Sequence, residues 1–163
     1  MAAALNPKYR TTPMLEAFAG EDVPGNAVWG TRVLYLADSE REAYRLHIVN
    51  GLIYDSQGNL FDTADASSLH TDRPRAIFVM DDDGNFYASK SHSAGEFHHS
   101  SLIAGRPVAA AGEMEVQEGR LVALSDRSGH YRPRRAFTGQ AIDRLKKNGV
   151  DFFSVRLDII SIE

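Results

Sequence analysis

Short apolar segments separated by glycine turns constrain the fold of this chain more than any other feature of its sequence. The Asn50-Gly51 pair favours the tight turn of a β-hairpin, because both residues accept a positive φ. Three pairs of strand-like segments are interrupted by such turns: 44–54 around Asn50-Gly51, 76–90 around 81–85, and 113–125 around Glu118-Gly119. Successive hairpins predict a sheet dominated by antiparallel pairing.

The flanking segments complete the expected architecture. Arg32–Leu36 is predicted to be a further strand, and Gly139–Lys147 a helix with Thr138 as its N-cap and Asn148-Gly149 after it. A last strand is expected over 152–160, which gives an α+β fold. Residues 1–30, with a short helix at 14–19, are predicted to be an arm or linker in front of a single domain, 31–163.

Composition narrows the function classes. The 163 residues include no cysteine, so disulfides, thiolate metal sites and a cysteine nucleophile are excluded. The formal charge of −4 provides no basic field for nucleic acid, which is an unlikely partner. The sequence contains no secretion signal and no membrane-length apolar run, so we expect a soluble domain that acts in a cytoplasm.

Phe97-His98-His99-Ser100-Ser101 is the first candidate site segment. It places four chemically competent side chains between apolar neighbours. In an extended conformation His99 and Ser101 would share one face. The alternative is that these side chains satisfy buried backbone groups at a strand end. The adjacency of His98 and His99 is unfavourable for a shared metal ion, and no metal is expected.

Ser128-Gly129-His130-Tyr131 is the second candidate segment, in a loop whose exit is fixed by Pro133. Arg132 belongs to a local basic patch that could hold a phosphate, although such patches are more often solvated surface. Glu113 and Glu115 point to one face of a strand, either as a pair of carboxylates with different pKa values or as a solvent face.

Several segments carry a resemblance to a known family: Glu40–Tyr44, Leu60–Thr63, Ile77–Val79 with Tyr87 and Lys90, Gly95-x-Phe97-x-His99-Ser100-Ser101-x-x-Ala104-Gly105, Ala110–Gly112, Ser128–Tyr131 and Asn148–Asp151. From about residue 41 to 155 the chain resembles the C-terminal domain of plant IQ-motif calmodulin-binding proteins and similar domains of bacterial toxins and effectors. The calmodulin-binding IQ segment is missing here, so calmodulin binding is not expected. Position 113 is basic in the plant pattern and acidic here.

The first functional hypothesis is a bacterial toxin or effector catalytic domain that is ADP-ribosyltransferase-like or cleaves NAD, with NAD as cofactor. The expected catalytic residues are His99, Glu113, His130 and Tyr131. Glu113 would stabilise the oxocarbenium-like state and Tyr131 would stack on the nicotinamide ring. The residues expected to bind substrate are Phe97, Ser100, Ser101, Lys90, Ser128 and Arg132.

Two alternatives stay open. The first is a metal-independent ribonuclease toxin in which His99 and His130 act as general base and acid. The second is a non-catalytic module that binds a ligand or a protein through the same residues. An immunity or regulatory protein is the partner expected of a toxin, while its target molecule is unspecified.

Overall fold

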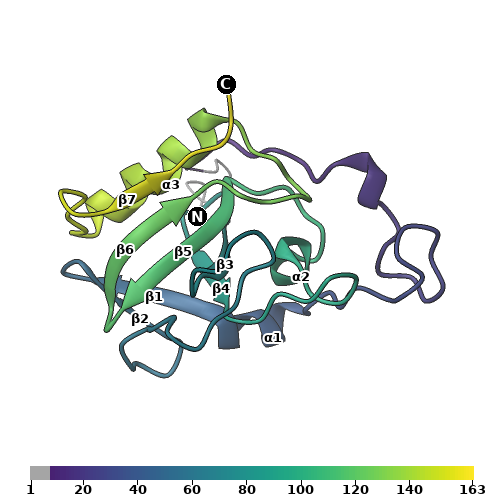
Figure 1. The fold of residues 1–163 in the computed structure, drawn as a ribbon, viewed down its shortest axis with the longest axis horizontal. Coiled ribbons are helices and arrows are strands. Elements are labelled where there is room, and N and C mark those ends of the chain that lie inside the picture. The colour runs from purple at the N-terminus through teal and green to yellow at the C-terminus, as the bar shows by residue number, and fades with distance from the viewer. Residues whose placement is uncertain (1–7) are drawn as a thin grey trace, which may run out of the picture.

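The structure, a computed structural model, describes residues 8–163. Its framework is one twisted sheet, in which seven strands are defined within that range, in the order β2-β1-β4-β3-β5-β6-β7 (Figure 1). The strands are β1 (Arg45–Val49), β2 (Leu52–Tyr54), β3 (Ala76–Met80), β4 (Phe86–Ser89), β5 (Ala110–Gln117), β6 (Arg120–Ser125) and β7 (Arg156–Asp158). Neighbours pair antiparallel except β6 and β7, which are parallel. The predicted α+β class is confirmed.

All three predicted hairpins form, each at the expected turn. Asn50 and Gly51 both adopt positive φ, 51° and 83°, and close the β1–β2 hairpin. Glu118 and Gly119 do the same between β5 and β6, with φ of 47° and 80°. These turns twist in the same sense as the strands, which fixes the pairing register.

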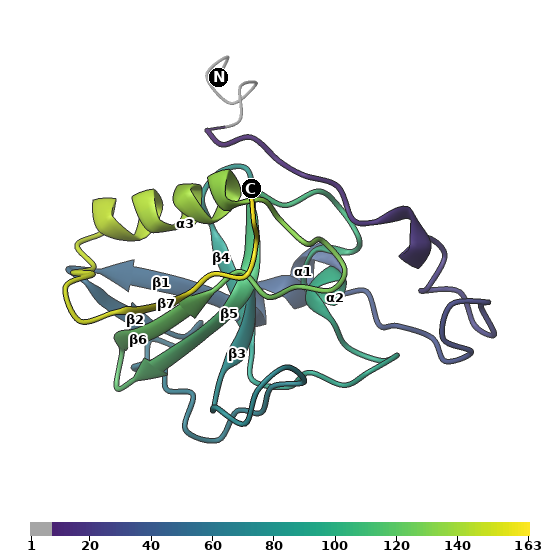
Figure 2. The same cartoon turned by 45° about the horizontal axis from the view of Figure 1, so that its top comes forward.

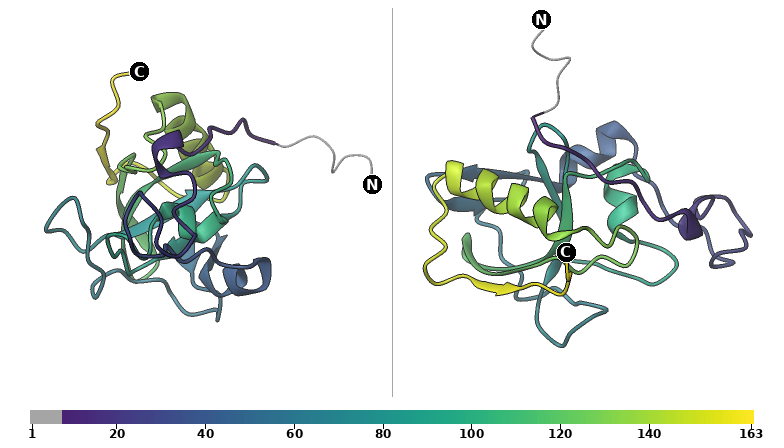
Figure 3. Two further views of the ribbon diagram at one scale, coloured as in Figure 1. Left: turned by 90° about the vertical axis from the view of Figure 1, so that its right-hand side faces the viewer. Right: turned by 90° about the horizontal axis from the view of Figure 1, so that it is seen from above.

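Two apolar clusters lie on opposite faces of the sheet. One face is covered by α3 (Arg135–Lys147), whose Ala141 and Leu145 are fully buried against β5 and β6 side chains (Figure 2). The other face packs against α2 (His99–Ile103) through Leu102 and Ile103. Seen from above, α3 and α2 lie well apart, and α2 is near the N-terminal segment (Figure 3).

The N-terminal segment runs along the end of the sheet that carries α2 (Figures 1 and 2). It includes η2 (Glu16–Phe18), where the sequence predicted a short helix, and continues to α1 (Asp38–Arg41) and η3 (Glu42–Tyr44). Residues 1–7 of the predicted arm lie outside the described range, and the division at residue 30 stays a prediction. Across residues 8–163, no helix has both the length and the apolar character needed to cross a membrane.

Four local predictions differ from the structure. Arg32–Leu36 is irregular, because its amides donate to carbonyls in two loops and in α2 rather than to a neighbouring strand. The segment His98–Ser101, considered above in an extended conformation, instead begins α2: His98 is the N-cap, and its amide donates to Ser101 Oγ at 3.0 Å. The predicted helix begins earlier, at Arg135, and the predicted last strand is limited to Arg156–Asp158.

Candidate functional site

Five of the six histidines of the chain gather in one cluster at the α2 end of the sheet. Only His47 lies apart, exposed on β1. The ring centroids are separated by 4.4 Å for His98–His130, 5.2 Å for His92–His98, 5.8 Å for His92–His99 and 5.8 Å for His70–His92. The two segments singled out in the sequence therefore meet, at His98 and His130. His70 and His92 join them from two loops.

Glu21 is the charged centre of one half of this cluster. Its side chain is fully buried and accepts hydrogen bonds from His130 Nε2 at 2.6 Å, Ser100 Oγ at 2.7 Å and the Tyr35 hydroxyl at 2.7 Å. Burial alone would raise the pKa of Glu21, but the bonds from His130, Tyr35 and Ser100 together outweigh it and lower that pKa. The carboxylate is therefore held ionised in the interior.

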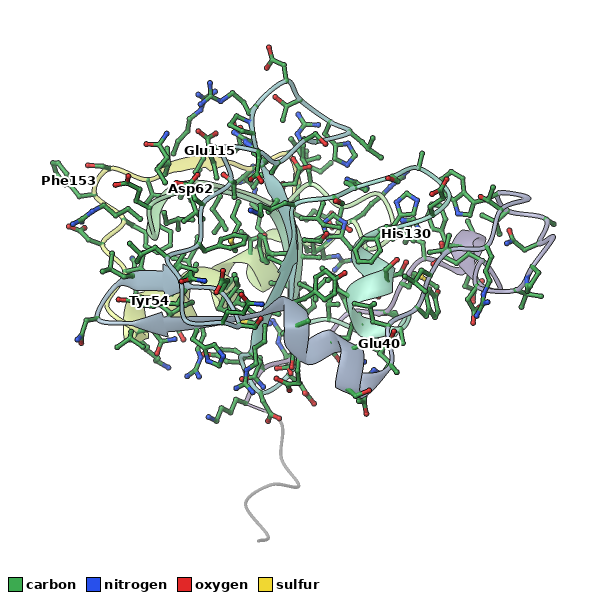
Figure 4. The ribbon with its side chains drawn as sticks, turned by 90° about the horizontal axis from the view of Figure 1, so that it is seen from below. Glu40, Tyr54, Asp62, Glu115, His130 and Phe153 are labelled. Atoms are coloured by element: carbon green, nitrogen blue, oxygen red, sulfur yellow. The ribbon has the colours of Figure 1, made fainter. Side chains whose placement is uncertain are left out.

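An aromatic stack encloses this carboxylate on the N-terminal side. Phe18 lies over the His130 ring at 4.0 Å between centroids, and Trp29 lies over His98 at 5.0 Å. The Trp29 Nε1 also reaches Glu21, at 3.3 Å. Figure 4 shows His130 toward the end of the molecule that carries the N-terminal segment, and Glu115 in a different part of the sheet. The stack fixes the planes of His98 and His130 and excludes water from Glu21.

The tautomers of His98 and His92 follow from their partners. The Gly95 amide donates to His98 Nε2 at 2.9 Å, so that nitrogen carries no hydrogen. Burial, followed by the charge of His130, lowers the pKa of His98 to about 4, and burial, followed by His98, lowers that of His92 to about 3. Neutral His98 must then donate from Nδ1 to His92 Nε2, at 3.2 Å. Neutral His92 consequently carries its hydrogen on Nδ1.

His99 and Tyr131 are buried and hydrogen-bonded to backbone carbonyls of other segments. His99 is almost fully buried and its Nε2 donates to the Gly112 carbonyl at 2.7 Å, while burial lowers its pKa well below the usual value. Tyr131 is 2 % exposed, and its hydroxyl donates to the Arg106 carbonyl at 2.7 Å. Gly112 has no side chain because a Cβ there would collide with the Ser125 backbone. The backbone of Ser125 thus occupies the space beside this glycine.

Glu113 is also fully buried, but its bonding is incomplete. Ser68 Oγ donates to Glu113 Oε2 at 2.6 Å, whereas Oε1 has no hydrogen-bond partner within residues 8–163. Burial raises the pKa of this carboxyl group, and the Ser68 bond offsets only part of the effect. His70, His92 and Glu113 each offer one nitrogen or oxygen atom within 4.8 Å of the others. This group has the donor set of a metal site.

A cleft lies next to this group. It has a volume of about 790 Å³ and is bordered by His70, the loop 126–134 and the C-terminal residues 160–163. Arg127, Arg132 and Arg134 supply positive charge to it, and Arg134 pairs with Glu163 at 3.7 Å. Both oxygens of buried Asp126 are engaged by the backbone amides of residues 160 and 161.

The predicted site residues separate into distinct locations. Ser100, Ser101, His99 and His130 are buried in the histidine cluster, while Ser128 and Arg132 line the cleft. Two predicted substrate-binding residues lie elsewhere. Lys90 is exposed and pairs with Asp65 at 3.0 Å, and Phe97 stacks on Tyr44 with 5.8 Å between centroids.

Glu115 is buried rather than on a solvent face, and its Oε2 is 2.6 Å from the Arg73 guanidinium. Glu21, His70 and His92 were missed in the sequence. Their only signal there was residue type, since each lies in an irregular segment without a motif.

Comparison with known proteins gives relatives in one plant. The chain is 32 % identical over 126 residues to the IQ domain-containing protein IQM2 of Arabidopsis thaliana, 33 % over 126 residues to IQM3 and 31 % over 124 residues to IQM4. The alignments cover 77 % of this chain for IQM2 and IQM3 and 76 % for IQM4. They cover only 20 % of IQM2, 26 % of IQM3 and 22 % of IQM4. The chain thus spans about a fifth to a quarter of their length. No solved structure matches.

These relatives overturn the first functional hypothesis. The prediction of a bacterial toxin or effector catalytic domain that is ADP-ribosyltransferase-like or cleaves NAD is wrong, because the similar proteins are plant IQ domain-containing proteins. The geometry explains the error: Tyr131, expected to stack on nicotinamide, is enclosed in the core, and His99 is bonded to backbone. The expectation of NAD depended on this hypothesis, and NAD binding stays untested.

The family itself is identified by the part of the chain that holds most of the sheet and the histidine cluster. Residues 40–137 match the model of the IQ motif-containing protein middle domain, a description that places the domain in the middle of its proteins rather than at their C-terminus. The matched range contains His70, His92, His98, His99 and His130 and leaves Glu21 outside. The chain belongs to the IQ motif-containing protein middle domain family.

Proposed function

We propose that this chain is a non-catalytic module that binds a regulatory protein partner in the cleft between the loop 126–134 and residues 160–163. The observation that carries the proposal is the enclosure of the chemically competent side chains. His99, His130 and Tyr131 are at most 3 % exposed and each makes a hydrogen bond to the protein itself. Side chains used in this way position loops and have no access to a substrate.

The charge of the cleft indicates what kind of partner fits. Arg127 and Arg132 line it, and neither forms an ion pair with another residue of the described range. The acidic residues of the cleft are already engaged, because Asp126 bonds to backbone amides and Glu163 lies beside Arg134. A partner that carries carboxylates would therefore meet arginine guanidinium groups whose charges are not neutralised.

The C-terminal residues add apolar surface to the same cleft. Ile160 is 54 % exposed and Ile162 is 92 % exposed, and both line it. Large apolar side chains next to free guanidinium groups match a segment that alternates acidic and apolar side chains. Membership of the family also supports a binding role, since the relatives are named for an IQ domain.

Fluorescence anisotropy with a labelled peptide of alternating glutamate and leucine tests the proposal. We expect saturable binding that weakens as salt is raised. Arg132→Glu should reduce affinity about tenfold or more, a loss of ~1.4 kcal/mol. Arg120→Glu, which makes the same charge change at the exposed first residue of β6, should have little effect. Equal losses in the two variants, or no binding, would reject the cleft as the binding site.

A second measurement addresses the non-catalytic part of the proposal. The protein is incubated with NAD and, separately, with total RNA, and nicotinamide release and RNA length are followed. Both should stay at the level of a buffer control. Turnover that disappears in His130→Ala, with the fold retained by circular dichroism, would contradict the proposal.

A further inference from the structure

We propose that His70, His92 and Glu113 bind a divalent transition-metal ion of the Zn²⁺ type at the edge of the cleft. Two imidazoles and one carboxylate form a donor set that suits Zn²⁺, Co²⁺ and related ions, and three protein ligands leave a further coordination position open. The three donor atoms already lie within 4.8 Å of one another. A contraction of less than 1 Å per ligand would bring them to bonding distances. This inference does not depend on the protein partner proposed above.

Two unsatisfied atoms point to a ligand in this place. Glu113 Oε1 and His92 Nδ1 are both buried and both lack a hydrogen-bond partner within residues 8–163. Glu113 is 0 % exposed and His92 is 8 % exposed. A buried polar group without a partner costs about 1–3 kcal/mol of stability. Both atoms belong to residues of the three-residue group, and both are explained if a cation satisfies them together.

Ser68 orients two of the three proposed ligands. Its hydroxyl donates to Glu113 Oε2 at 2.6 Å and accepts the backbone amide of His70 at 2.9 Å. The carboxylate is thus held with Oε1 free, and the loop that carries His70 is tied to β5. His92 is oriented in the same way by its 3.2 Å contact with His98. Supporting contacts of this kind are characteristic of metal-binding histidines and carboxylates.

The proposed site is open to solvent on one side only. His70 is exposed and lines the cleft, whereas His92 and Glu113 lie behind it. An ion can therefore enter from the cleft and keep a water molecule or a partner's side chain as its fourth ligand. On the inner side, the buried Glu113 carboxyl group, whose Oε1 has no hydrogen-bond partner within residues 8–163, gains a cation as its partner.

Metal binding also requires a change of tautomer that can be measured. In the metal-free chain the hydrogen of His92 is on Nδ1, the unpartnered nitrogen. To bind a metal ion through Nδ1, His92 must carry its hydrogen on Nε2 instead. His92 Nε2 then donates to His98 Nδ1, and the hydrogen of His98 moves from its Nδ1 to its Nε2. The number of protons on the pair is unchanged. The Gly95 amide loses its acceptor, so the metal ion should loosen the loop at Gly95.

Isothermal titration of the whole chain with Zn²⁺, and the visible spectrum with Co²⁺, test the site. We expect one ion per chain and Co²⁺ absorption bands of a four- or five-coordinate complex. His70→Ala is the main variant, because its side chain is exposed and its loss should leave the fold intact. Glu113→Gln is the second, since it keeps the shape of the side chain. Each should weaken Zn²⁺ binding about tenfold or more.

His47→Ala is the matched control, because His47 is an exposed histidine outside the cluster. It should bind Zn²⁺ like the wild-type chain. An NMR readout adds a specific signature: Zn²⁺ should shift the ring nitrogens of His92 and His98 and speed hydrogen exchange at the Gly95 amide. The proposal would be overturned if no binding were detected at about 1 mM Zn²⁺, which corresponds to a binding free energy smaller in magnitude than ~4 kcal/mol. Binding that survives in both His70→Ala and Glu113→Gln, or that His47→Ala removes equally, would also overturn it.

Discussion

Glu21 and Glu113 are two buried glutamates of the same cluster, both 0 % exposed, yet their surroundings are opposite. The oxygens of Glu21 accept bonds from His130, Ser100 and Tyr35. Glu113 has one bonded oxygen and one without a partner in the described chain. The pKa of Glu21 is lowered although burial opposes it, and burial raises the pKa of Glu113.

The difference separates a structural carboxylate from one that can take a ligand. A buried carboxylate with all its lone pairs used joins distant segments and cannot bind anything else without losing those bonds. A buried carboxylate with an unpartnered oxygen has lost the hydrogen bonds of water at that oxygen without replacing them, and a bound cation can compensate for this loss. Stability measurements should therefore respond strongly to changes at Glu21, and metal-binding measurements to changes at Glu113.

The largest expected effect comes from Glu21→Ala. This variant leaves the donors of His130, Ser100 and Tyr35 buried without their acceptor, which should lower the free energy of unfolding by about 3–5 kcal/mol. Urea unfolding followed by tryptophan fluorescence measures it. Glu16→Ala, an exposed glutamate of the same segment, should change stability by less than about 0.5 kcal/mol. Similar values for the two variants would refute the central role of Glu21.

The second prediction concerns pH. Unfolded histidines bind a proton below about pH 6.5. His92 and His98 stay neutral in the folded chain down to about pH 3 and 4. Between about pH 6.5 and pH 4 the unfolded state therefore binds more protons than the folded state. The free energy of unfolding should fall as the pH is lowered through this range. Each histidine changes the free energy of unfolding by at most ~1.4 kcal/mol per pH unit.

Other groups near these histidines modify the pH profile in known directions. Glu21, with a lowered pKa, loses its stabilising bonds only below pH 4.5, while Glu113, with a raised pKa, opposes the histidines from about that pH upward. His70 and His130 also face the pair. The measurement is urea unfolding at pH 7, 6 and 5. A free energy of unfolding that is unchanged between pH 7 and 5 would contradict the neutral, buried state of His92 and His98.

The third prediction is a small effect of Glu113→Gln on the metal-free chain. The substitution removes a buried ionisable group that has only one of its two oxygens hydrogen-bonded. The free energy of unfolding should therefore stay within about 1 kcal/mol of wild type or rise. Glu21→Gln, the matched change, should be clearly destabilising because the four donors from His130, Ser100, Tyr35 and Trp29 then compete for one oxygen. Thermal unfolding of both variants with a chelator present makes the comparison. A larger loss for Glu113→Gln than for Glu21→Gln would reverse our interpretation of the two sites.

The sequence predicted the fold better than the site, for physical reasons that particular residues illustrate. The Asn50-Gly51 and Glu118-Gly119 turns depend on local backbone preferences, so both hairpins could be placed from neighbouring residues alone. Glu21 could not be found in this way, because Ser100 and His130 are 79 and 109 positions away along the chain. The two polar motifs meet in the fold, at His98 and His130, but their burial could not be predicted because it is a property of the folded chain.

The last prediction concerns Ser68→Ala, which distinguishes the proposed metal site from a merely polar pocket. Loss of the Ser68 hydroxyl removes one hydrogen bond to Glu113 and one from the His70 amide, at a cost of about 1–2 kcal/mol in the metal-free chain. If Ser68 orients metal ligands, the variant should also bind Zn²⁺ about tenfold more weakly, and the stabilisation by Zn²⁺ should shrink accordingly. Ser56→Ala, which removes a hydroxyl bonded to the Ala43 carbonyl far from this group, should leave Zn²⁺ binding unchanged. An unchanged Zn²⁺ affinity in Ser68→Ala, measured by titration at pH 7, would show that Ser68 stabilises the loop without positioning a metal ligand.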